Sequence, residues 1–295
     1  MEMHHLIIHF LIVVTQFLTG VLTNGFIVVV NVVDFIKHRQ MAPLDLLLSC
    51  LATSRITLQM LIILSHLVLL SFVKMSVLTK LNTVLMFVSD WGLWLATWLG
   101  VFYCARITTI SHPMFFWLKR RISKLVPCLI LGSTLYSFIM SGFHEKQSVN
   151  LIQNVMLNFF SKNATHLMGI ESAATSVLIF HFMVPLLVFL IALLVLIVTL
   201  GRHTWRMRAM SPGTRDPRSR APLRALLSIL SFLILYFSHY MMSILFMFQT
   251  LQFGSFLFEF CSLTVAIYPS IHSVILILGN AKLKQSAKRF LLCGQ

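Results

Sequence analysis

The chain has 295 residues, of which 58% are hydrophobic and only 11% are charged. A soluble globular protein of this length needs more polar surface, so the composition excludes that class and indicates a membrane protein. The formal net charge of +15 would suit a protein that binds nucleic acid, but the basic residues are placed between apolar runs, which excludes that class too.

Seven apolar runs are each long enough to cross about 30 Å of hydrocarbon, which takes roughly 20 helical residues. They cover residues 6–33, 44–70, 81–110, 125–143, 173–200, 223–248 and 256–279. We therefore predict an all-α membrane protein whose seven-transmembrane helix bundle occupies residues 1–280. A short amphipathic tail, residues 281–295, should follow and lie along the inner leaflet.

Lysines and arginines concentrate in the loops after the first, third and fifth runs and in the tail. Cytoplasmic loops carry an excess of these residues, so we predict the N-terminus outside and the C-terminus in the cytoplasm of a multi-pass plasma-membrane protein. The single N-x-Ser/Thr sequence, at Asn163, lies on the predicted outer side and predicts an N-glycan. The loop that holds it, residues 144–172, has apolar residues at helical spacing and is expected to form a lid. The five cysteines lie in the runs or the tail, which excludes a disulfide between that loop and the third run.

The first two runs carry polar residues that hydrocarbon does not solvate. Asn24 lies among small residues, and we expect its amide to join neighbouring helices rather than to bind a ligand. Arg55 lies deep in the second run and should face the bundle interior, where it can hydrogen-bond to Asn24, hydroxyls or carbonyls. It is either a fixed brace or a brace that exchanges partners when the helices move.

The third run begins with an acid and several tryptophans. Asp90, Trp94 and Trp98 are four residues apart, which places them on one helical face. Aromatic residues near a membrane surface are usually interfacial anchors. Because Trp98 lies more than a turn below the predicted outer end, the pattern favours the wall of a ligand pocket.

The predicted inner loops are basic and aromatic. Pro113 is expected to interrupt the third helix. Aromatic and basic side chains follow it, and more arginines follow the fifth run, in which Pro185 predicts a kink. These side chains either anchor the bundle to the lipid or contact a cytoplasmic partner. The residues of this inner face are Phe115, Trp117, Arg120, Arg121, Arg206 and Arg208.

The sequence gives no sign of an enzyme. It contains neither an H-E-x-x-H nor a G-x-S-x-G motif, and its histidines are scattered, so we expect no metal and no cofactor. A small-solute transporter or channel is the alternative to a receptor. Transporters usually show repeated halves and acids at mid-membrane depth, whereas the number of runs here is odd, and Asp90 and Glu259 are expected toward the outer end.

Several short motifs are typical of one family. They are NG at 24–25, LAxSR at 51–55, WLAT at 94–97, FY at 102–103 and HSxxLIL at 272–278. With these motifs the chain resembles the bitter taste receptors, the type 2 class of G-protein-coupled receptors, along its whole length. The signatures of rhodopsin-like receptors are missing, since Tyr103-Cys104-Ala105 replaces the acid-Arg-aromatic triplet and no N-P-x-x-Y ends the seventh run.

The resemblance implies detection of bitter small molecules and activation of a gustducin-type heterotrimeric G protein that leads to phospholipase C signalling. It implies a ligand site that includes Trp94, Trp98 and a tyrosine of the sixth span, matched here to Tyr240. Some members carry a carboxylate where this chain has Ser262, and Asp90 or Glu259 could substitute for it. It also marks His272 and Ser273, with Asn24 and Arg55, as structural or activation residues, and it makes the inner-face residues candidate contacts of the G protein.

Overall fold

The computed structural model describes residues 2–70, 75–107, 113–160, 183–199, 201–202, 230–231, 233–234, 237–238 and 256–293. Within these ranges every regular element is an α-helix. The labelled helices are α1 (Glu2–His38), α2 (Pro43–Leu70), α3 (Met75–Ile107), α4 (Pro113–Phe160), α7 (Phe256–Gly279) and α8 (Ala281–Cys293). An apolar helix also runs over Met183–Thr199.

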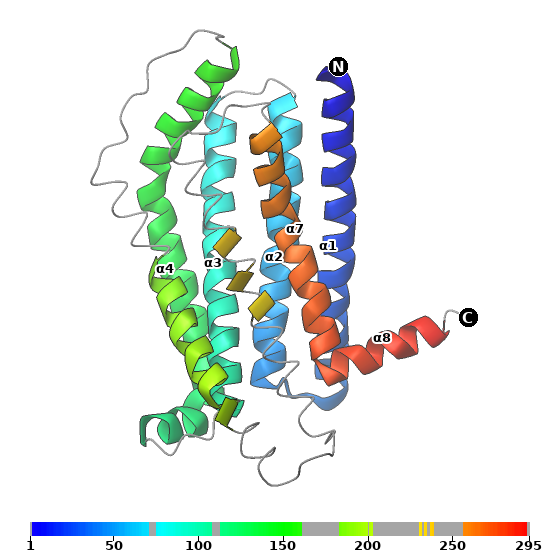
Figure 1. The fold of residues 1–295 in the computed structure, drawn as a ribbon, viewed down its shortest axis with the longest axis vertical. Coiled ribbons are helices and arrows are strands. Elements are labelled where there is room, and N and C mark those ends of the chain that lie inside the picture. Colours follow the sequence, from blue (N-terminus) through cyan, green and yellow to red (C-terminus); the bar gives the residue numbers. More distant parts are fainter. Residues whose placement is uncertain are drawn as a thin grey trace.

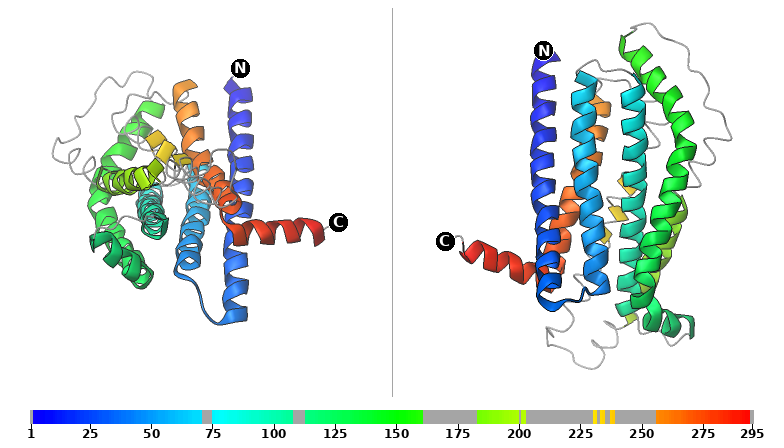
Figure 2. Two further views of the ribbon diagram at one scale, coloured as in Figure 1. Left: turned by 60° about the horizontal axis from the view of Figure 1, so that its bottom comes forward. Right: turned by 180° about the vertical axis from the view of Figure 1, so that it is seen from behind.

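The long helices run roughly parallel to one another (Figure 1). α1, α2, α3 and α4 stand in a row, and α7 crosses on one side of that row and packs against α1. The chain begins at one end of the bundle, while α8 turns away from α7 at the opposite end, as the two views of Figure 2 also show. The predicted all-α bundle is confirmed for the described residues.

Among the residues that the structure describes, four helices are long and apolar enough to cross a membrane. Their spans are Leu11–His38, Pro43–Ser65, Lys80–Arg106 and Phe116–Phe143, and two shorter apolar helices are Met183–Thr199 and Pro269–Gly279. These six segments fall within or overlap six of the predicted runs, and α7 coincides with the predicted run 256–279. Most of the predicted sixth run lies outside the described residues, so the number of seven spans remains a prediction.

α4 is longer than predicted at both ends. It begins at Pro113, a residue type favoured in the first turn of a helix because it needs no hydrogen-bonded N–H there, and it continues to Phe160. Residues 144–160, predicted as part of a separate lid, instead extend α4. The physical reason is that no proline or glycine interrupts residues 143–160. The rest of the predicted lid, with Asn163, lies outside the described residues.

α3 begins earlier than predicted, at Met75. Asp90 is therefore the sixteenth of its 33 residues, roughly 22 Å along the axis at 1.5 Å per residue. The part of α3 that is apolar enough to cross a membrane, Lys80–Arg106, begins one residue before the predicted run 81–110, so Asp90 is the eleventh residue of that span. The aromatic residues of α3 lie near the middle of the span.

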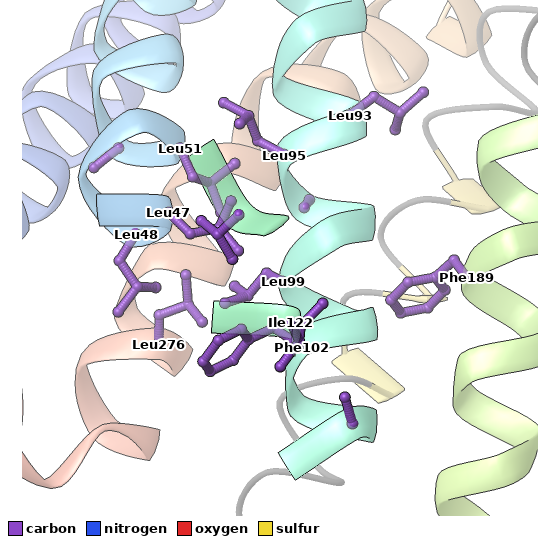
Figure 3. Close-up of a cluster of buried hydrophobic side chains, with 14 of the residues drawn as sticks. Leu47, Leu48, Leu51, Leu93, Leu95, Leu99, Phe102, Ile122, Phe189 and Leu276 are labelled. Carbon is purple, nitrogen blue, oxygen red and sulfur yellow. The ribbon is translucent and has the colours of Figure 1, made fainter. Parts of the chain in front are cut away.

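The buried core joins α1, α2, α3, α4, α7, the start of α8 and the Met183–Thr199 helix, and Figure 3 shows part of it. Leu47, Leu95 and Phe189 are among its most completely buried side chains. A β-carbon on Gly100 would lie 2.7 Å from the Phe189 ring, so the glycine permits the close approach of α3 and the Met183–Thr199 helix. Large apolar side chains such as Leu22, 72% exposed, point away from this core, as expected for a surface in contact with lipid.

Candidate functional site

Arg55 is the centre of a buried polar cluster between α1, α2 and α7. Its side chain is only 3% exposed. Nη1 donates to the Ser273 hydroxyl at 3.0 Å, and Nη2 donates to Nδ1 of His272. Because a guanidinium carries only donors, Nδ1 must accept, so the His272 ring is the neutral tautomer with its proton on Nε2.

Ser273 carries this cluster on to α1. Its hydroxyl accepts from Arg55 and lies within hydrogen-bonding distance of two acceptors, Oδ1 of Asn24 at 2.6 Å and the Pro269 carbonyl of α7 at 2.7 Å. Asn24 is fully buried and donates from Nδ2 to the Gly20 carbonyl at 2.8 Å. The four residues predicted as structural or activation residues therefore meet in one place, where one hydroxyl links three helices. Their functional role remains a prediction.

A second polar layer lies one helical turn along α2, at Gln59. Its Nε2 donates to the Ser270 hydroxyl at 3.1 Å, and that hydroxyl is 3.4 Å from the Gln16 carbonyl. Gln59 is 4% exposed and lies directly against Gly20 of α1. This layer again joins α1, α2 and α7, so the same three helices are tied twice.

A third polar layer lies at the end of the bundle where α8 begins. Lys282 Nζ is 2.7 Å from Oδ2 of Asp34 and 2.7 Å from Oδ2 of Asp45, and it donates to Oδ1 of Asn31 at 3.3 Å. Asn31 in turn donates to the Ser49 hydroxyl at 3.1 Å. Partial burial disfavours the charge on Lys282, but the hydrogen bonds and charges of the two carboxylates outweigh it, so the pKa of Lys282 is raised above its usual 10.5.

The same contacts fix the start of α8. The Asn280 side chain accepts from the backbone N–H of Lys282 at 3.0 Å and of Leu283 at 3.3 Å, which is helix N-capping. Leu283 is completely buried, whereas Phe290 is 75% exposed. The first turn of α8 is therefore held to the bundle, and its later turns extend away from it (Figure 1).

The aromatic face of α3 is formed by Trp91, Trp94 and Trp98. The rings of Trp94 and Trp98 are stacked with centroids 5.5 Å apart, and Tyr136 of α4 meets Trp94 edge-on at 5.5 Å. The indole Nε1 atoms of Trp91, Trp94 and Trp98 are buried, and none has a hydrogen-bond partner in the described part of the chain. Such donors are costly inside a membrane protein, which makes this face the strongest candidate for a ligand site.

Asp90 lies on α3 beside this face and contacts α4. Its Oδ2 accepts from the Ser137 hydroxyl at 2.5 Å, and the residue is 7% exposed. On the far side of α3, Gly92 lies against α2, because a β-carbon there would be 3.1 Å from Oγ of Ser54, the neighbour of Arg55. The aromatic face and the Arg55 cluster are thus at similar depth and share the α2–α3 contact.

The predicted inner face is partly described. Arg106 near the end of α3 donates to the Ser123 hydroxyl of α4 at 2.7 Å, which joins the two helices there. Arg121 stacks over the Trp117 ring with its guanidinium carbon 5.5 Å from the centroid. Trp117 and Arg120 are exposed on the first turns of α4, which lie at an angle to the rest of that helix (Figure 2).

Several predicted residues are not described in full. Phe115, Glu259 and Ser262 are placed only as helical backbone in α4 and α7. Asn163, Arg206, Arg208 and Tyr240 lie outside the described residues. The contact predicted between Tyr240 and the tryptophans of α3 is therefore not tested. Among the described residues, no group of three His, Cys, Asp or Glu side chains could hold a metal ion.

Sequence reasoning missed several residues of these clusters. Gln59 follows Arg55 by four residues, and this spacing on one helical face was a usable signal. Lys282 resembled an ordinary tail lysine, and neither of its acidic partners is near it in sequence. Tyr136 and Ser137 carried no signal, because only the packing of α4 on α3 brings them to the tryptophans.

Comparisons with known proteins identify the family. The family model "Taste receptor protein (TAS2R)" matches residues 1–295. The chain is 53% identical to "Taste receptor type 2 member 1" of Pan paniscus over 290 residues, 98% of this chain and 97% of that one. It is 49% identical to "Taste receptor type 2 member 119" of Mus musculus over 288 residues (98% and 86%), and 34% identical to "Taste receptor type 2 member 2" of Homo sapiens over 292 residues (97% and 96%). The chain therefore belongs to the type 2 taste receptor (TAS2R) family, the bitter taste receptors, and is a membrane receptor rather than an enzyme.

Proposed function

We propose that this bitter taste receptor crosses the plasma membrane seven times, binds bitter small molecules at the aromatic face of α3, and activates a heterotrimeric G protein of the gustducin type. Its N-terminus is outside and its C-terminus is cytoplasmic. The observation that carries the proposal is the position of the Arg55 cluster. It joins α1, α2 and α7 at mid-bundle, next to the α2–α3 contact behind the tryptophans.

The ligand site includes Asp90, Trp94 and Trp98, with Tyr240, Glu259 and Ser262 completing it from the sixth and seventh spans. Two stacked indoles offer broad apolar faces but few fixed polar anchors. Such a site binds in the micromolar range or more weakly, about −8 kcal/mol or less in magnitude. This suits a receptor that detects many compounds at high concentration.

The link from ligand to G protein runs through movement of the helices around the Arg55 cluster. A ligand that shifts a receptor from mostly resting to mostly active must favour the active bundle by several kcal/mol. The buried guanidinium of Arg55 donates hydrogen bonds to a hydroxyl and to an imidazole. It can give these hydrogen bonds to other acceptors when the helices move from the resting to the active arrangement. The inner face, which comprises Phe115, Trp117, Arg120, Arg121, Arg206 and Arg208, then contacts the G protein.

The test is calcium release in cells that express the receptor with a taste G protein, against a panel of bitter compounds. The proposal predicts concentration-dependent release that Trp94→Ala weakens at equal surface expression, and an Arg120→Ala, Arg208→Ala receptor with reduced efficacy. The second candidate function is a small-solute transporter or channel, which the buried charge of Arg55 would suit. Solute flux without any G-protein response would favour that candidate and contradict the proposal.

A further inference from the structure

The hydrogen-bonding character of the aromatic face is one-sided. Trp91, Trp94 and Trp98 follow one another at spacings of three and four residues, so they share one face of α3. Each indole has one polar atom, an N–H that donates and cannot accept. The three Nε1 atoms are buried, and the described part of the chain offers them no acceptor. The face therefore presents three donors without partners near mid-membrane, where lipid cannot supply acceptors.

The cost of these donors decides which ligands they favour. A buried donor without a partner is much more costly than a made hydrogen bond is favourable. A ligand that brings an acceptor removes this cost, whereas a ligand that brings only donors or a cation leaves it in place. A site with buried polar groups discriminates strongly against a ligand that cannot form hydrogen bonds with those groups. An apolar pocket discriminates less between two ligands that differ by one methylene.

The acid beside this face is bonded to α4 through one of its two carboxylate oxygens. Asp90 is one of the two acids, with Glu259, predicted to anchor cationic ligands, and its Oδ2 accepts from Ser137 of α4 at 2.5 Å. The stacking of Trp94 on Trp98 and the edge contact with Tyr136 hold the indoles in place. Since the donors are fixed on rigid rings, a matching ligand need not order them on binding.

We propose that the aromatic face of α3 selects neutral ligands that present hydrogen-bond acceptors, such as lactone, ester, amide or ketone carbonyls, on an apolar skeleton. This inference rests on the proposed ligand site and adds the chemical class that the site prefers. The buried Nε1 groups of Trp91, Trp94 and Trp98 are the specificity-determining atoms, and Trp91 belongs with the two tryptophans predicted from the sequence.

The experiment pairs one change in the receptor with one change in the ligand. Each of Trp91, Trp94 and Trp98 is replaced by 3-benzothienylalanine, which keeps the ring shape but has sulfur in place of N–H. Two probes share one polycyclic skeleton, one with a ring lactone and the other with the matching carbocycle. Leu135→Met serves as the control, because Leu135 is an exposed side chain of α4. Binding is measured on the purified full-length receptor in lipid nanodiscs, with calcium release recorded separately in cells.

The proposal predicts that the parent receptor binds the lactone more tightly than the carbocycle. Loss of N–H at one or more of the three sites should weaken lactone binding about tenfold, equivalent to about 1.4 kcal/mol, and carbocycle binding less than twofold. Equal binding of the two probes, or equal losses for both in every variant, would overturn it. Binding that follows this pattern without calcium release would refute the signalling function and leave the selectivity intact, so the two failures are distinguishable.

Discussion

The side-chain amide of Gln59 fills the space that a β-carbon on Gly20 would need. Gln59 Nε2 lies 1.8 Å from the position of that β-carbon. Because Gly20 of α1 has no side chain, it leaves room for the Gln59 amide of α2, and the same amide donates to Ser270 of α7. Small residues allow membrane helices to approach closely, and here the close approach also places a hydrogen bond.

Gly20→Ala should destabilise the receptor, because the new methyl would displace Gln59 from Ser270 and leave buried polar groups without partners. We expect a loss of about 1–3 kcal/mol, measured as thermal unfolding of the purified receptor. Gly25→Ala on the same helix is the control: its β-carbon would meet nothing within 4 Å, so it should be neutral or stabilising. In a Gln59→Ala background the alanine at position 20 should be tolerated. Equal effects of the two alanines would contradict this reading.

Ser273→Ala should disconnect Arg55 from Asn24. The hydroxyl lies between the two side chains at 3.0 and 2.6 Å, so its loss leaves buried donors and an acceptor without that partner and should cost about 1–3 kcal/mol. Ser141→Ala is the matched control, since Ser141 is also buried but donates to Phe138 of its own helix. Surface expression and thermal stability should fall for Ser273→Ala and change little for the control. A Ser273→Ala receptor as stable as the control would exclude a bracing role for this hydroxyl.

Lys282→Met should loosen α8 from α1 and α2, because it leaves Asp34 and Asp45 facing each other without the cation. We expect the free energy of unfolding to fall by about 1 kcal/mol, since the three charged groups are partly exposed and solvent screens them. Lys284→Met is the control, as the described residues include no ion pair for Lys284. The pKa of Lys282 is raised above its usual 10.5 in the folded receptor, so its contribution to stability is fully present below that value and is lost only as pH rises through the higher folded pKa. The difference between the two variants should stay constant from pH 7 to pH 9. A difference that disappears in this range would contradict the ion cluster.

Asn163 tests the orientation of the chain. If the loop after the fourth span is extracellular, expressed receptor should carry one N-glycan there, and Asn163→Gln should remove the mass shift seen on glycosidase treatment. Protease access to Lys162 from the cytosolic side alone would invert the proposed topology.

The presence of long membrane-crossing α-helices was predictable from the sequence, because apolar runs of this length form helices when they cross a membrane. The bounds of α7 followed from the apolar run itself, whereas the start of α4 at Pro113 lies twelve residues before the predicted fourth run. The length of α4 beyond residue 143 did not follow, since a polar helix end and a polar loop have similar composition. The start of α3 at Met75, six residues before the predicted run, did not follow for the same reason.

The sequence allowed several residues of the candidate site to be predicted, but few of the contacts that they make with other helices. Helical spacing placed Trp94 and Trp98 on one face, and the cost of a buried charge required partners for Arg55. Spacing within one helix does not say which neighbour that face meets. Ser137 opposite Asp90 and the two carboxylates around Lys282 therefore emerged only from the packing of separate helices.

The central claim, that this TAS2R family member converts binding of a bitter compound into G-protein activation, is tested most directly by nucleotide exchange. Purified receptor in lipid nanodiscs is mixed with a gustducin-type heterotrimer, and GTP uptake is followed with and without an agonist found in the calcium screen. The account predicts agonist-dependent exchange that Trp94→Ala shifts to higher agonist concentration, with no agonist-dependent solute flux through the same receptor in liposomes. Agonist binding that changes solute flux but leaves nucleotide exchange at its basal rate would contradict it.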